Sequence, residues 1–108
     1  MKVKAAVLNS ARNIQFSEDE IPDRLDPGEV LIETKSVGIC GSDLHFYLYG
    51  ELGDIKLGNP LILGHEVSGI VKDIGSQDLA LSVGDRVALE PGIPCMTCTI
   101  CRKGMYHL

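Results

Sequence analysis

Short stretches of β-branched and apolar residues, separated by turn signals, set the strongest limit on how this chain folds. Residues 29–37 follow an Asp-Pro-Gly turn, residues 67–74 end at Gly-Ser, and residues 86–89 follow Gly-Asp. Such spacing is typical of antiparallel barrels and sandwiches. Residues 1–8, with their short apolar stretch, are interpreted as a first strand. We therefore predict a mainly β fold.

One short helix is expected between these strands. Ser42 or Asp43 is a suitable N-cap for the segment 44–48, and Gly50 is a suitable end. Residues 51–59, which lie among several glycines, are expected to form a mobile loop. The chain contains no G-x-G-x-x-G between a strand and a helix, and no strand-helix alternation. It therefore does not predict a dinucleotide-binding sheet within these residues.

Length and charge exclude several classes of protein. The chain has 108 residues, of which 44% are hydrophobic, enough for one domain but not two. Its net charge of −5 disfavours binding to nucleic acid. The first apolar stretch is too short for a signal peptide, and no stretch is long enough to span a membrane. We expect a protein of the reducing cytosol, with no membrane and no nucleic-acid partner.

Three of the four cysteines, Cys95, Cys98 and Cys101, form a C-x2-C-x2-C run. Three thiolates on a tight loop suit a tetrahedral zinc site that needs one more ligand, and in a reducing compartment they favour metal over disulfides. The same spacing opens a bacterial four-iron cluster motif, but the position of its last cysteine is Met105 here. His107 is a loose fit for the fourth ligand, and a solvent-facing role suits it better.

A second candidate metal site combines Cys40 with the adjacent pair His65 and Glu66. Thiolate, imidazole and carboxylate, with a fourth position open, suit a catalytic zinc. Adjacent ligands require a sharp bend in the backbone, and Gly64 supplies the freedom for it. The pair also begins like the H-E-x-x-H helix of metalloproteases, but Gly69 stands at the second histidine, so that interpretation fails.

Four motifs together resemble the zinc-containing medium-chain alcohol and polyol dehydrogenases. They are G-I-C-G-S-D-L-H at 38–45, G-H-E-V-S-G at 64–69, G-D-R-V-A-L-E-P-G at 84–92 and the three-cysteine run. The resemblance implies a mainly β, GroES-like β-barrel with short helices and a zinc-binding lobe. It also implies that residues 1–108 are an N-terminal catalytic-domain fragment that lacks the Rossmann domain for NAD or NADP.

The resemblance implies a role for each matching residue. It makes Cys40 and His65 ligands of a catalytic zinc, with Glu66 as a direct ligand in polyol dehydrogenases. It makes Ser42 the group that receives the substrate proton, His45 a later member of the proton relay, and Asp43 the carboxylate that orients the zinc histidine.

The three-cysteine run matches three of the four ligands of the family's structural zinc, Cys95, Cys98 and Cys101. The fourth would stand at position 109, so this site is expected to be incomplete in residues 1–108.

The implied substrate is a small polyol or alcohol, oxidised as by sorbitol or xylitol dehydrogenase. L-Threonine or butanediol dehydrogenase of the same family remains an alternative, as does a metal-binding structural or electron-transfer module. The full-length chain is expected to be a homodimer or homotetramer, and the fragment alone is expected to be inactive.

Overall fold

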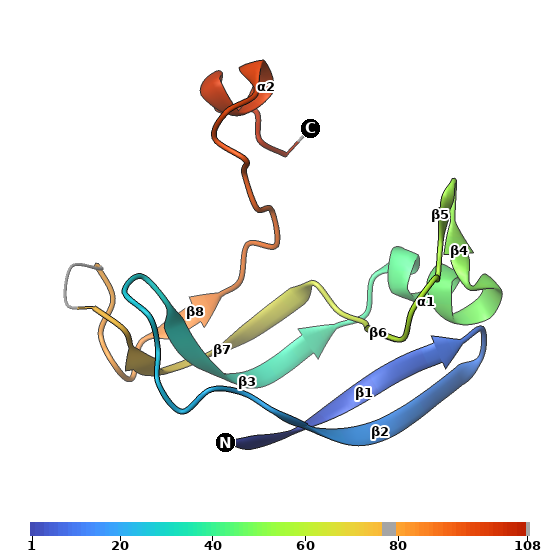
Figure 1. The fold of residues 1–108 in the computed structure, drawn as a ribbon, viewed down its shortest axis with the longest axis horizontal. Coiled ribbons are helices and arrows are strands. Elements are labelled where there is room, and N and C mark those ends of the chain that lie inside the picture. Colours follow the sequence, from blue (N-terminus) through green and yellow to red (C-terminus); the bar gives the residue numbers. More distant parts are fainter. Residues whose placement is uncertain (77–79, 108) are drawn as a thin grey trace.

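A computed structural model describes residues 1–76 and 80–107, and strands dominate it (Figure 1). Two three-stranded sheets and a small two-stranded ribbon account for the strands, so the prediction of a mainly β chain is confirmed. The elements in chain order are β1 (Lys2–Ser10), β2 (Asn13–Glu20), β3 (Val30–Gly38), α1 (Gly41–Tyr49), β4 (Glu51–Leu52), β5 (Ile55–Lys56), β6 (Leu61–Ile62), β7 (Glu66–Ile74), β8 (Arg86–Ala88) and α2 (Thr99–Arg102).

All strand pairings in the described residues are antiparallel. The first sheet has the order β2-β1-β6, and the second has the order β3-β7-β8. Figure 1 shows the two sheets side by side, with α1 and the β4–β5 ribbon beside the ends of β1 and β3. The candidate ligands Cys40, His65 and Glu66 lie at the ends of β3 and β7 that are near α1.

The predicted strands are present, but β2 was missed. Its sequence N-I-Q-F-S-E-D-E carries four polar or acidic residues in its second half and is exposed along its whole length. Pairing with β1, rather than burial, holds it in place. The prediction of a loop over residues 51–59 is wrong in part, because β4 and β5 pair there as a hairpin that turns at Gly53, whose φ is +59°.

The helix begins earlier than predicted. Its N-cap is Cys40, which has an extended backbone, rather than Ser42 or Asp43. Asp43 caps the helix from inside the first turn, since its carboxylate accepts a hydrogen bond from the Cys40 N–H at 3.0 Å. The predicted end is confirmed, because Gly50 adopts a left-handed conformation with φ of +69° and its N–H reaches the Phe46 carbonyl.

The hydrophobic core within the described residues is small. Only Ala5, Leu8 and Val71 are buried apolar residues, while many large apolar side chains are exposed. The radius of gyration is 16.1 Å, compared with about 13 Å for a compact chain of this length. The segment after β8 leads away from the sheets to α2 (Figure 1). No helix in the described residues is long and apolar enough to span a membrane.

Candidate metal centres

Strand register brings the first set of candidate ligands together. The last residue of β3, Gly38, is paired with the first residue of β7, Glu66. Cys40 lies two residues beyond the end of β3, and His65 lies one residue before β7 begins, so both reach the same end of the sheet. The ligand atoms of Cys40, His65 and Glu66 all lie within 4.8 Å of one another. The structure therefore gathers the three residues that the sequence analysis singled out.

Two glycines make this convergence sterically possible. A Cβ at Gly38 would stand 2.4 Å from the Glu66 Oε2, so any other residue there would displace the carboxylate. Gly64 has φ of +118°, and a Cβ on it would meet Val37 Cγ1 at 3.0 Å. The prediction that Gly64 bends the chain before His65 is confirmed by this conformation.

The Asp43 carboxylate contacts two of the candidate ligands, Cys40 and His65. One carboxylate oxygen accepts the hydrogen bond from the Cys40 N–H at 3.0 Å, and the other lies 3.5 Å from His65 Nδ1. Asp43 is the only buried charged residue in the described part of the chain, with 9% of its surface exposed. A carboxylate on Nδ1 leaves Nε2 as the ring nitrogen free to bind a metal.

Hydrogen bonds favour charge on Cys40 and His65. The pKa of the Cys40 thiol is lowered, mainly by hydrogen bonding with Ser42 and then with His65. The pKa of His65 is raised, first by its hydrogen bond with Cys40 and then by the nearby Asp43 carboxylate. The thiolate, not the thiol, is the form that binds a metal, and a lowered pKa favours the thiolate.

Ser42 and His45 lie on α1, immediately after Cys40. They are three positions apart, so they share one face of the helix. Ser42 is partly buried and His45 is exposed. The His45 ring packs against Tyr49 on the next turn, with ring centroids 4.7 Å apart.

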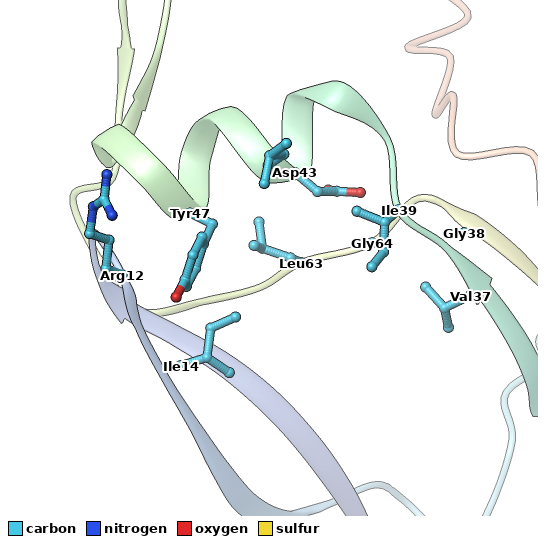
Figure 2. Close-up of a pocket in the computed structure, with 10 residues that line it drawn as sticks. Arg12, Ile14, Val37, Gly38, Ile39, Asp43, Tyr47, Leu63 and Gly64 are labelled. Carbon is cyan, nitrogen blue, oxygen red and sulfur yellow. The ribbon is translucent and has the colours of Figure 1, made fainter.

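An apolar pocket of about 460 Å³ lies beside this cluster (Figure 2). Figure 2 shows Asp43, Ile39 and Gly64 at one end and Arg12 and Tyr47 at the other. Among the described residues that line it, none is a candidate metal ligand, and neither proton-relay candidate is present. Of the residues discussed for the cluster, Asp43, Gly38 and Gly64 border the pocket, and the candidate ligands do not.

The second candidate centre lies in the segment that leads away from the sheets. Cys95, Cys98 and Cys101 have sulfur atoms within 4.8 Å of one another, and Cys95 and Cys101 are 3.7 Å apart. All four cysteines are free. His107 is exposed and is not part of this group in the described residues.

Local hydrogen bonds surround the sulfur atoms of this group. The Thr97 hydroxyl and the Cys98 N–H both point to the Cys95 sulfur, at 3.5 Å and 3.4 Å, and the Cys101 N–H lies 3.3 Å from the Cys98 sulfur. The hydrogen bonds from Thr97 and Cys98 lower the pKa of Cys95 to about 6, with Thr97 the largest cause. Cys95 is therefore mostly thiolate at neutral pH.

Both groups have the donor chemistry of a zinc site. In a tetrahedral site with Zn–S bonds of about 2.3 Å, two sulfurs stand about 3.8 Å apart, close to the 3.7 Å between Cys95 and Cys101. In a four-iron cluster each cysteine binds a different iron, which holds the sulfurs farther apart. Cys40, His65 and Glu66 offer one sulfur, one nitrogen and one oxygen, the mixed set of a zinc site with an open position.

Two structural contributors were missed by sequence reasoning. Gly38 was included in a motif without a role, although its missing side chain leaves room for Glu66. Tyr106 was given no role, yet its hydroxyl donates a hydrogen bond to Glu90. The role of Gly38 depends on the register of β3 against β7, which only the structure shows. No local sequence signal marks the role of Tyr106.

Comparison with known proteins identifies the family of this chain. Residues 26–108 match the alcohol dehydrogenase GroES-like domain family. A probable D-xylulose reductase A from Neosartorya fischeri is 45% identical over 102 residues, which cover 94% of this chain and 28% of that protein. The chain therefore spans less than a third of the curated relative it matches.

Solved structures show the same fold. L-idonate 5-dehydrogenase from Escherichia coli matches with a TM-score of 0.87 and 32% identity, over 98% of this chain and 30% of that one. A putative zinc-binding dehydrogenase from Sinorhizobium meliloti, bound to NADP, matches with a TM-score of 0.75 and 33% identity, over 97% and 29%. The expected fold class is confirmed, and the chain belongs to the alcohol dehydrogenase GroES-like domain family.

Proposed function

We propose that this chain is the zinc-binding part of a polyol dehydrogenase, which oxidises a secondary alcohol of a small polyol to a ketone with NAD or NADP. The observation that carries the proposal is the convergence of Cys40, His65 and Glu66 within 4.8 Å at one end of the β3–β7 pair. The similarity to D-xylulose reductases supports a polyol as substrate.

Cys40, His65 and Glu66 hold the catalytic zinc in this proposal. When bound, zinc supplies Lewis-acid polarisation of the alcohol oxygen, and the nicotinamide accepts the hydride. Asp43 fixes the ring of His65 and the backbone of Cys40 at the same time, since its two oxygens face the two residues. Hydrogen bonding with Ser42 lowers the pKa of the Cys40 thiol, which favours the thiolate, the form that binds a metal.

Ser42 and His45 form the path for the proton. The Ser42 hydroxyl lies beside the Cys40 thiol and takes the proton of the substrate hydroxyl while its own proton moves on. His45, one turn later on the same face and exposed to solvent, releases the proton to water. The Tyr49 ring restricts the orientation of His45.

Cys95, Cys98 and Cys101 would hold a second, structural zinc, with a further residue outside 1–108 as the fourth ligand. The Rossmann domain for NAD or NADP also lies outside these residues. We further propose that the full-length enzyme works in the cytoplasm as a homodimer or homotetramer.

The test is zinc analysis and turnover of the full-length protein. We expect two zinc ions per chain and oxidation of xylitol or sorbitol with NAD or NADP. L-Threonine and 2,3-butanediol serve as competing substrates, and a preference for either would replace the polyol proposal. Iron instead of zinc would contradict the assignment of both centres.

A further inference from the structure

The lobe that carries the three cysteines is poorly tied to the rest of the described chain. Residues 95–107 follow an irregular stretch after β8, and Figure 1 shows α2 standing apart from both sheets. Backbone hydrogen bonds of the lobe stay inside it, such as that from the Met105 N–H to the Ile100 carbonyl. Among the hydrogen bonds of residues 1–76 and 80–107, the bond from Tyr106 to Glu90 alone joins the lobe to the preceding chain.

Tyr106 makes two contacts at the base of the lobe. Its hydroxyl donates to a Glu90 carboxylate oxygen, sixteen residues earlier. Its ring lies over Gly92, where a Cβ would stand 3.3 Å from ring atom Cε2 and 3.4 Å from Cδ2. Gly92 therefore leaves the space that the ring occupies. The two contacts close the segment 90–106 into a loop, with all three thiols inside it.

We propose that Tyr106 is a positioning residue that clamps this loop shut, so that Cys95, Cys98 and Cys101 are held together before a metal binds. The inference rests on the proposed metal site at these cysteines, but not on the Cys40 cluster. Closing a loop in advance removes part of the ordering that binding would otherwise require. The clamp therefore raises metal affinity without contributing a ligand.

The test measures cobalt binding in the full-length protein with Cys40→Ser as background, which removes the thiol of the other cluster. Cobalt bound by thiolates gives a near-ultraviolet charge-transfer absorption, so the titration reports on the three-cysteine site. Tyr106→Phe keeps the ring and loses the hydroxyl, and we expect the dissociation constant to rise about three- to tenfold. Glu90→Ala should have the same effect, and the two together should be no worse than either alone.

Conservative replacement separates positioning from loss of charge. Glu90→Gln keeps an oxygen that can accept the Tyr106 hydrogen bond, and it should bind cobalt within about twofold of the parent. Tyr47→Phe removes a hydroxyl from α1 and serves as the matched control, with no change expected. Gly92→Ala should weaken binding, because the new Cβ presses on the Tyr106 ring.

A second measurement does not need the metal. Arg102 and Lys103 are exposed trypsin sites inside the loop, and an opened clamp should speed their cleavage in the metal-free protein several-fold. Tyr106→Phe that matches Tyr47→Phe in both cobalt affinity and cleavage rate would overturn the clamp. A background protein that binds no cobalt would overturn the thiol-positioning role. Polyol turnover, measured in the protein with Cys40 intact, tests the proposed function separately.

Discussion

The two cysteine clusters of this chain are built in opposite ways. Cys40, His65 and Glu66 come from distant parts of the sequence and meet because β3 pairs with β7 in one register. Cys95, Cys98 and Cys101 lie within seven consecutive residues, and their sulfurs are arranged by hydrogen bonds from Thr97 and from neighbouring N–H groups. The first cluster depends on tertiary structure, and the second depends mainly on a local loop.

This difference matches the two proposed tasks. A catalytic site needs an open position with its ligands oriented by surrounding groups, and the pairing of β3 with β7, Gly64 and Asp43 provide that orientation. A structural site needs four ligands that hold a loop in one shape, and neighbouring residues of one loop can supply three of them. Substitutions in the sheet should therefore disturb the first cluster alone, and those in the lobe should disturb the second alone.

The largest expected effect separates the two clusters directly. Cys40→Ser in the full-length enzyme should lower kcat by at least about a thousandfold and remove one zinc per chain, because it deletes a ligand of the metal that polarises the substrate. Cys98→Ser should also remove one zinc, but its main effect should be a lower melting temperature, with little change in kcat. Zinc analysis, steady-state kinetics and thermal unfolding measure these effects. Equal losses of activity in the two variants would contradict the division into a catalytic and a structural site.

Gly38→Ala tests whether strand register positions the first cluster. The added methyl would overlap the Glu66 carboxylate, at 2.4 Å from Oε2. We expect kcat/KM to fall about 10- to 100-fold, with the zinc affinity of the first cluster reduced. Gly58→Ala is the control, because a Cβ there meets nothing within 4 Å. Unchanged kinetics in Gly38→Ala would show that Glu66 does not need its observed position.

Asp43→Asn should have an effect at or below that of Gly38→Ala. The amide oxygen still accepts the bond from the Cys40 N–H, but the amide NH₂ now faces His65 Nδ1 and favours the wrong tautomer. Loss of such a partner typically costs about 10- to 100-fold in metal affinity or activity. Cobalt affinity and kcat measure it, and full activity would mean that His65 is oriented by other groups.

Much of this comparison was visible in the sequence. The spacing of three cysteines predicted the second cluster because its geometry is local, and Gly64 before His65 predicted the bend. The N-cap was misplaced because Asp43 caps from the N3 position, back to Cys40, which a search for polar N-caps does not detect. Pattern reasoning finds residues that act through their immediate neighbours.

Contacts that depend on tertiary structure were beyond the sequence. The space that Gly38 leaves for Glu66 follows from a register between strands that are about thirty residues apart, and two irregularities interrupt that register. The Tyr106 bond to Glu90 depends on the path of the chain after β8. Strand β2 was missed because its exposed, acidic sequence carries no signal of burial.

The smallest expected effect concerns the sheet that supports the first cluster. Glu33 on β3 pairs with Lys72 on β7 and with Lys35, and these hydrogen bonds lower its pKa from 4.5 to about 2. A lowered carboxyl pKa contributes stability above about pH 4.5, and that contribution is lost as the pH falls through about 2. The partners are exposed, so the contribution is small.

Lys72→Ala should therefore lower the melting temperature by only a few degrees at pH 7, and the difference from the unsubstituted protein should shrink between pH 4.5 and 2. Lys56→Ala, on the exposed β5 strand, is the control and should show no such pH dependence. Thermal unfolding of the metal-free protein, followed by circular dichroism, measures the effect without interference from the acid loss of zinc. A constant difference across this pH range would mean that Lys72 supports the sheet through packing of its side chain rather than through the charge on Glu33. The ion pair would then not contribute to the strand register that gathers the first cluster.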